Sequence, residues 1–321
     1  MAVHRLGTKK MNTAHFLSKA GIAAVALLLA VTPARAARKI SVIGSTEDMA
    51  SISREIGGDR VNVDSIARGY QDPHFVEPKP SFLLKLQKAD LLVVVGRQLE
   101  IGWLPALINQ SRNPKVQIGA SGYLDASLNC NILEVPTTEV TRAMGDVHPV
   151  GNPHYWLDPQ NGLRIAKAVE QKLSQLQPED AKYFAERYAD FERRVREAEK
   201  RWDAKMAPYR GRKVIPYHNS WPNFAKRFGL HVMAFIEPKA GIPPSPSHTL
   251  QLIGFMKKEN IKVIMVEPYF DLRTPESIAR QTGGQVVVLM PSVGGVKEIK
   301  DYFDLFDYDL NLLTSVFAKL K

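Results

Sequence analysis

Residues 91–95, with the sequence LLVVV, form an uninterrupted apolar run that ends at Gly96. A short apolar run without a helical period is typical of a central strand that is buried on both faces of a sheet. Strand-like runs and amphipathic stretches alternate around it. We predict strands over residues 40–44 and 61–67, and helices over residues 47–56, 81–87 and 103–109. This alternation predicts a parallel sheet covered by helices.

The second half of the chain repeats the alternation. With 321 residues the chain is long for a single hydrophobic core, so two α/β domains are the natural expectation. The fold class is therefore α/β, with two lobes that each hold a mainly parallel sheet flanked by helices. We predict strands over residues 213–217, 230–235, 263–266 and 286–289, and helices over residues 221–228, 249–259, 275–281 and 302–320.

Between these halves, a helix over residues 161–176 is followed by a longer amphipathic pattern from Pro178 to about residue 207. At about 1.5 Å per residue, such a helix spans roughly 40 Å and could cross a two-domain molecule. A coiled-coil arm of a dimer is the alternative. Packing on the chain's own domains is favoured, so we expect a monomer. The apolar side chains form one stripe, made by Phe184, Tyr188, Phe191, Val195, Ala198 and Trp202.

The N-terminal segment has the three parts of a secretory signal peptide. Basic residues precede an apolar run over residues 20–31, which is followed by the small residues Ala34 and Ala36. We therefore expect residues 1–36 to be cleaved off and the protein to be exported to the periplasm. An uncleaved anchor is the alternative, although the run is short for a membrane-spanning helix. No cysteine directly follows the run, so we expect no lipid anchor.

The charge of the remaining chain is mildly positive. Residues 37–321 carry 38 basic and 33 acidic side chains, a formal charge of +5. The excess is spread along the chain, whereas nucleic-acid binding calls for a concentrated basic face. We therefore expect no nucleic-acid partner.

Three histidines lie in short, rigid contexts flanked by aromatic residues: His74 in QDPHF, His154 in GNPHYW and His218 in PYHNSW. A proline directly before His74 and His154 stiffens the backbone that carries each ring. His74 and His218 are predicted to follow strands, where α/β sheets bind ligands. Neutral imidazole is the commonest protein ligand of metals, and three imidazoles are a standard zinc set. The pattern predicts one metal site assembled from distant loops.

Other side chains compete for a place at this site. His148 lies near His154 but lacks its aromatic neighbours, so it is ranked second, as a gate, an orienting group, a ligand or an exposed residue. Glu267, at the end of the strand over residues 263–266, is a candidate fourth ligand, as is Asp271. A carboxylate in this position could equally orient a ligand histidine. Both roles stay open.

In this order, the motifs resemble the zinc/manganese solute-binding proteins of bacterial metal ABC transporters, of the cluster A-I type. The resemblance covers nearly the whole chain after the signal segment. It rests on DPHxxEP at residues 72–78, NPHxWxD at residues 152–158, the long helix after Pro178, His218 ahead of an FG helix stop, and VEP at residues 266–268.

The resemblance implies two α/β lobes, residues 37–177 and 209–321, joined by one long rigid helix over residues 178–208. It places the metal between the lobes, with His74 and His154 from the first lobe and His218 from the second.

One motif of the family is missing. Its members commonly add an aspartate ligand in the loop after the last strand, but this chain has Met-Pro-Ser at residues 290–292. A water, Glu267 or Asp271 could complete the coordination instead. Three imidazoles favour Zn²⁺ over Mn²⁺, which prefers more oxygen ligands.

We therefore expect a periplasmic protein that binds zinc with high affinity and delivers it to an ABC permease in the inner membrane by transient docking. It is not expected to be an enzyme. A secreted zinc-dependent hydrolase is the alternative, with Glu267 as its one fair general base. Against it, the chain has no His-Glu-x-x-His or Gly-x-Ser-x-Gly motif. A metal-binding adhesin or buffer of the same fold also stays open.

Overall fold

The computed structural model describes residues 1–4, 7, 38–140 and 148–320. The predicted signal peptide, residues 1–36, lies almost entirely outside the described residues. The chain divides into a unit of residues 1–38 and a compact unit of residues 39–321. All helices and strands of the described residues belong to the second unit. Among the described helices, none combines the length and the apolar character needed to cross a membrane.

The first sheet is parallel throughout and has the strand order β2-β1-β3-β4. Its predicted strands are confirmed, and β4 is additional, because three residues are too few for a recognisable pattern. Helices α2, α3, α4 and α5 accompany this sheet. The elements are β1 (Ile40–Gly44), α2 (Glu47–Gly57), β2 (Val61–Ser65), α3 (Pro80–Lys88), β3 (Leu91–Val94), α4 (Leu104–Ser111), β4 (Tyr123–Asp125) and α5 (Pro159–Leu176).

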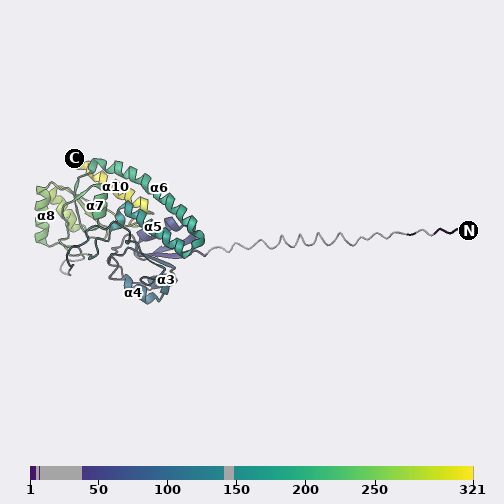
Figure 1. Cartoon of the computed structure of the whole chain (residues 1–321). Helices are drawn as coiled ribbons and strands as arrows, with labels where there is room; N and C mark the ends of the chain where they lie inside the picture. Colours follow the sequence, from purple (N-terminus) through teal and green to yellow (C-terminus); the bar gives the residue numbers. More distant parts are fainter. Residues whose placement is uncertain (5–6, 8–37, 141–147, 321) are drawn as a thin grey trace. The chain divides into compact units, whose positions relative to one another are not determined.

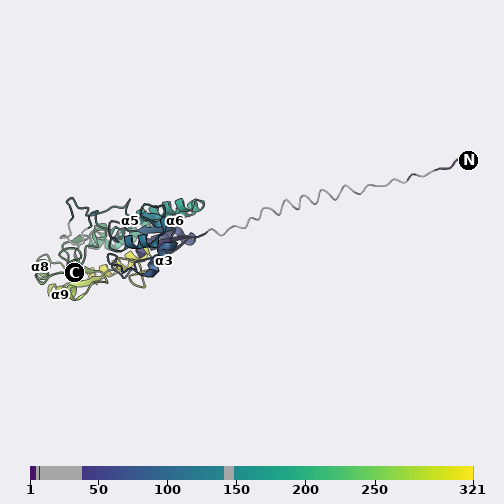
Figure 2. The same ribbon diagram turned by 90° about the horizontal axis from the view of Figure 1, so that it is seen from below.

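The second sheet is also parallel, and its order β6-β5-β7-β8 repeats that of the first. Edge strand β6 has two residues, fewer than the six predicted. Figure 2 shows α8 and α9 gathered at the end of this unit away from α3. The elements are β5 (Lys213–Pro216), α7 (Pro222–Phe228), β6 (His231–Val232), α8 (Pro246–Lys258), β7 (Val263–Val266), α9 (Arg273–Thr282), β8 (Gln285–Val288) and α10 (Tyr302–Lys319).

The predicted long helix is α6 (Ala181–Met206), with 26 residues, which follows a single 3-10 turn (Pro178–Asp180). Figure 1 shows it running along α5 and α10. Its apolar stripe is buried and packs against α5, α10 and α2 of the same chain. The buried members are Phe184, Phe191, Val195, Ala198, Trp202 and Met206.

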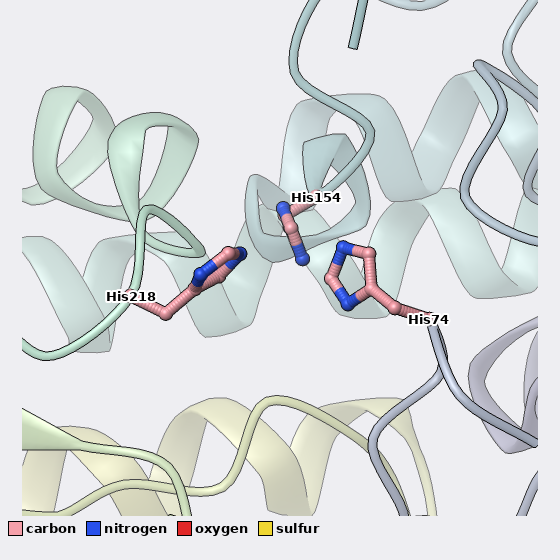
Figure 3. Close-up of side chains that lie close together, drawn as sticks. All are labelled: His74, His154 and His218. Atoms are coloured by element: carbon pink, nitrogen blue, oxygen red, sulfur yellow. The ribbon is translucent and has the colours of Figure 1, made fainter. Parts of the chain in front are cut away.

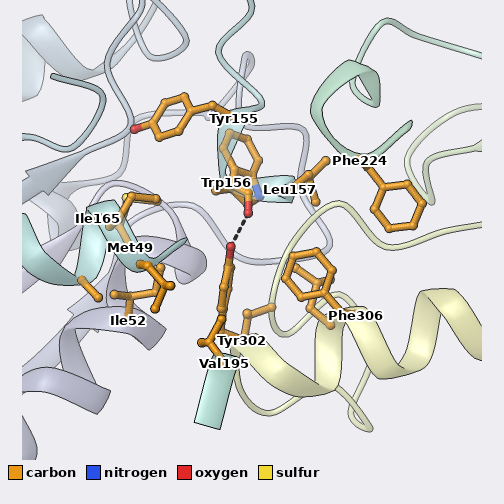
Figure 4. Close-up of a cluster of buried hydrophobic side chains, with 14 of the residues drawn as sticks. Met49, Ile52, Tyr155, Trp156, Leu157, Ile165, Val195, Phe224, Tyr302 and Phe306 are labelled. Carbon is orange, nitrogen blue, oxygen red and sulfur yellow. Dashed lines mark hydrogen bonds between the residues drawn. The ribbon is translucent and has the colours of Figure 1, made fainter. Parts of the chain in front are cut away.

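One hydrophobic cluster runs through both halves of this unit and includes α6 (Figure 4). At its centre the hydroxyl of Tyr302, on α10, donates a hydrogen bond to the carbonyl of Trp156, just ahead of α5. Gly162 makes room for this contact, because a Cβ there would lie 2.4 Å from the Tyr302 ring. Two smaller clusters cover the other face of each sheet. The shared core couples the two sheets, while the lobe boundaries stay a prediction.

Candidate metal centre

Three separate segments bring His74, His154 and His218 together (Figure 3). His74 lies between β2 and α3, His154 precedes the short 3-10 turn that leads into α5, and His218 lies between β5 and α7. Each ring contributes one nitrogen atom to a group of three nitrogens that all lie within 4.8 Å of one another. His74 follows β2 and His218 follows β5, so each of the two sheets contributes a loop from the carboxyl ends of its strands, where α/β folds bind ligands.

The spacing of the rings suits a tetrahedral ion. Two imidazoles that bind one zinc at about 2.0–2.1 Å have ring centres roughly 5 Å apart. The observed distances between ring centres are 5.1 Å for His74 and His154, 5.3 Å for His74 and His218, and 5.7 Å for His154 and His218. The three rings therefore already have the separation that a shared zinc requires.

A repeated local motif orients two of the rings. The Oδ1 atom of Asp72 accepts the backbone N–H of His74 at 2.9 Å and contacts its Nδ1 at 2.8 Å. The Oδ1 atom of Asn152 does the same for His154, at 3.0 Å in both contacts. An oxygen acceptor at Nδ1 places the ring proton there and leaves Nε2 with its lone pair. The motif is Asx-Pro-His, and its repetition in the sequence is a signal that could have identified Asp72 and Asn152 as orienting residues.

The third ring is oriented from a distant segment. The Nδ1 atom of His218 lies 2.7 Å from Oε2 of Glu237, which also accepts the backbone N–H of Gly241. Glu237 follows β6, and its side chain is 5% exposed. Glu237 was not predicted as a functional residue, because nothing in the sequence pairs it with His218. Histidines that bind metals usually have such a partner on their other nitrogen.

Two ring nitrogens of this cluster lack hydrogen-bond partners within the described residues. The Nε2 atoms of His74 and His154 are buried, and within the described residues neither has a partner. Buried polar atoms in folded proteins are nearly always satisfied. A metal ion bound to these two nitrogen atoms would satisfy both. The unpartnered atoms are therefore independent support for a metal ion at this site.

Burial and neighbouring charge set the protonation of the rings. Burial, and next the positive charge that His74 would carry, hold the pKa of His154 well below its ordinary value. Burial alone would lower the pKa of His218, but the hydrogen bond to Glu237 and the charge of Glu267 outweigh it, and that pKa is raised. The neutral, metal-binding form of His154 is therefore favoured, whereas protons compete for His218 more strongly than for an ordinary histidine.

The candidate fourth ligands lie outside the three-histidine cluster. Glu267 follows β7 and is fully buried, and its Oε1 accepts the indole N–H of Trp221 at 2.9 Å. Burial raises the pKa of Glu267 to about 7, against the opposing charge of His218. Asp271 is exposed and pairs with Arg273, whose backbone and side-chain N–H groups donate to it.

The loop after β8, where a family aspartate would lie, is engaged in structural contacts. The backbone N–H of Met290 donates to Asp309, and the carbonyl of Pro291 accepts the indole N–H of Trp156. The Ser292 hydroxyl donates to Asp48, on α2. This loop therefore ties the two halves together.

His148 lies beside the cluster. Its ring stacks on that of His74, with ring centres 5.5 Å apart and planes at 29°. Its Nε2 is buried, and no described residue satisfies it. Burial and the neighbouring His74 lower its pKa to about 4. His148 lines a pocket of about 310 Å³ together with His154 and His218; the other lining residues are Glu134, Asn152, Asn219 and Ala240.

The fold and the site together define a class of protein that can hold a transition-metal ion on imidazoles at the strand ends of two parallel sheets. The chain belongs to the family described as zinc-uptake complex component A, periplasmic, which it matches over residues 42–316. The family resemblance read from the motifs, and the predicted fold class, are thereby confirmed.

Individual relatives carry the names of two metals. A metal ABC transporter substrate-binding lipoprotein of Lactococcus lactis is 25% identical over 292 residues, 88% of this chain and 89% of that protein. A manganese ABC transporter substrate-binding lipoprotein of Streptococcus mitis is 22% identical and covers 97% of this chain and all of its own length. A crystal structure of ZnuA aligns with a TM-score of 0.72 at 25% identity, over 87% of this chain and 99% of its own.

Proposed function

We propose that this protein captures a divalent metal ion, with Zn²⁺ preferred, and delivers it to an ABC-type importer. The observation that carries the proposal is the convergence of His74, His154 and His218 at ring spacings of 5.1–5.7 Å, each with an oxygen acceptor at Nδ1. The family supports the transport role, since its description is that of a zinc-uptake component.

The donor set supports zinc over manganese. All three converging ligands are nitrogen atoms, and the cluster of described residues contains no carboxylate. Tetrahedral nitrogen sites suit Zn²⁺, whereas Mn²⁺ favours oxygen ligands and higher coordination numbers. The names of the relatives include both metals, so this preference is drawn from the ligands of this chain.

The proposed setting is the periplasm. Residues 1–36 would direct export and be removed, and the mature monomer would dock transiently on an ABC permease in the inner membrane. The periplasmic description of the family and the signal-like N-terminal sequence support this setting.

A carrier role, without catalysis, also agrees with the position of Glu267. The hydrolase alternative needs a general base beside the metal. Glu267 was the candidate, but neither of its carboxylate oxygens belongs to the cluster formed by the three histidines. Turnover of an ester, peptide or β-lactam by the zinc-loaded protein would favour a hydrolase instead.

Calorimetry on the chelator-stripped protein tests the proposal. We expect sub-micromolar zinc binding with one ion per chain, lost in His154→Ala and retained in His231→Ala. His231 is exposed on β6 and serves as a matched control. Absence of sub-micromolar binding by the unmodified protein, or binding that survives His154→Ala, would contradict the proposed function.

A further inference from the structure

Three imidazoles leave a tetrahedral ion one ligand short. In the second half of the chain, the Oε1 atom of Glu267 accepts a hydrogen bond from Trp221, whereas its buried Oε2 has no partner among the described residues. The loop after β8 uses its polar groups in contacts with Asp309, Trp156 and Asp48. Glu267 and His148 are therefore the candidates for a fourth protein ligand, and both lie outside the cluster of three nitrogens.

The ring of His148 stacks on that of His74, beside the cluster. The distance between the ring centres of His148 and His74, 5.5 Å, falls within the range that separates the three converging rings. Its Nε2 is buried and lacks a partner in the described part of the chain, as do those of His74 and His154. His148 also lines the same pocket as His154 and His218. It therefore shares with His74 and His154 a buried Nε2 that lacks a partner among the described residues, and its ring contacts that of His74.

His148 differs from the other histidines in how it is held. The rings of His74 and His154 are fixed to a side chain two residues earlier. The His148 ring lies instead beside the backbone of Arg97. Its chain turns at Gly151, which has a φ of 97°. Because its nitrogen lies outside the 4.8 Å cluster, a shift of this turn is needed to bring His148 onto the ion.

We propose that His148 is the fourth ligand, so that its Nε2 completes a tetrahedral site of four imidazoles around a zinc ion held by His74, His154 and His218. This inference rests on the proposed function. It replaces the carboxylate expected after β8 with a nitrogen donor from the other half of the chain. A site closed by four nitrogen ligands excludes water from the ion and disfavours metals that need oxygen ligands.

X-ray absorption at the zinc edge tests the proposal, because scattering from imidazole rings reports how many histidines bind. The zinc-loaded protein is expected to show four imidazoles and His148→Ala three. His231→Ala, the exposed-histidine control, is expected to keep four. Calorimetry should show His148→Ala binding zinc at least about tenfold more weakly, with circular dichroism spectra of the variants confirming that they are folded.

The outcomes separate this inference from the proposed function. Three imidazoles in both the unmodified protein and His148→Ala, with zinc affinities within twofold, would overturn the role of His148. The carrier function would then stand if His154→Ala still lost binding. An unmodified protein that does not bind zinc would overturn both.

Discussion

The side-chain oxygen of Asn152 lies 3.0 Å from both the backbone nitrogen and the ring Nδ1 of His154. One acceptor thus fixes the direction of the ring and the position of its proton. The Asn152 amide also donates to Glu134 and to the carbonyl of Asn219. Asn219 directly follows His218, so the hydrogen bond from Asn152 connects the segment that carries His154 with the segment that carries His218.

Asp72 offers the cleaner test of this arrangement, since its Oδ1 serves His74 in the same way. Asp72→Ala should weaken zinc binding by about 10–100-fold, the usual cost of losing a group that orients a metal ligand. Asp72→Asn keeps an oxygen acceptor and should lose much less. Titration calorimetry measures both. Equal losses in the two variants would mean that charge, rather than orientation, matters at this position.

Glu237→Gln should weaken zinc binding by about tenfold at neutral pH, because His218 loses a carboxylate that makes it a stronger ligand. It should also change the pH dependence. The folded-state pKa of His218 is raised by Glu237, so in the unmodified protein protons displace zinc as pH falls below that raised value. The variant binds protons less tightly, so its decline should begin at lower pH. Affinities measured from pH 5 to pH 8 that fall in parallel would contradict this explanation.

Asp48→Asn should flatten the pH dependence of stability. Burial raises the pKa of Asp48 from 3.8 to about 7, despite hydrogen bonds from Val293 and Ser292. A carboxyl with a raised folded-state pKa contributes its full stability below pH 4 and loses it as pH rises toward 7. The slope is at most about 1.4 kcal/mol per pH unit for one group. Urea unfolding of the metal-free protein between pH 4.5 and pH 8 measures it; identical slopes in both proteins would show that Asp48 does not titrate as stated.

Tyr302→Phe should lower the free energy of unfolding by about 1–3 kcal/mol, because the buried Trp156 carbonyl loses its donor. The substitution keeps the ring that packs against Gly162. Tyr308→Phe, on the same helix at a partly exposed position, should change stability by less than about 0.5 kcal/mol. Chemical denaturation compares the two. A loss in Tyr308→Phe as large as that in Tyr302→Phe would contradict the assignment.

Much of the fold could be predicted because its strands are buried on both faces and appear as apolar runs. The run at residues 91–95 and its counterpart at residues 263–266 became β3 and β7. Strand β4 was missed because three residues carry no period. Strand β6 was predicted too long because the apolar residues after Val232 pack as loop.

The three converging histidines were predicted from their local contexts, whereas the residue that orients His218 was not. The Asx-Pro-His motifs set the rings of His74 and His154 locally, so their contexts marked them. The contact between His218 and Glu237 spans 19 residues and depends on how β5 and β6 pair. No local pattern reports a contact that tertiary packing creates. His148 was ranked below His154 because its local context lacks the aromatic neighbours of His154.

The three orienting hydrogen bonds also differ in how they can be broken. Those of His74 and His154 close within two residues, whereas that of His218 joins two loops. Rings held by protein groups are preorganised, so an ion is captured with little ordering cost and leaves slowly. The rate of metal uptake by the transporter would then depend on how fast the binding protein releases its ion. A displacement of the loop that carries Glu237 would remove the orienting contact of one histidine while those of the other two stay in place.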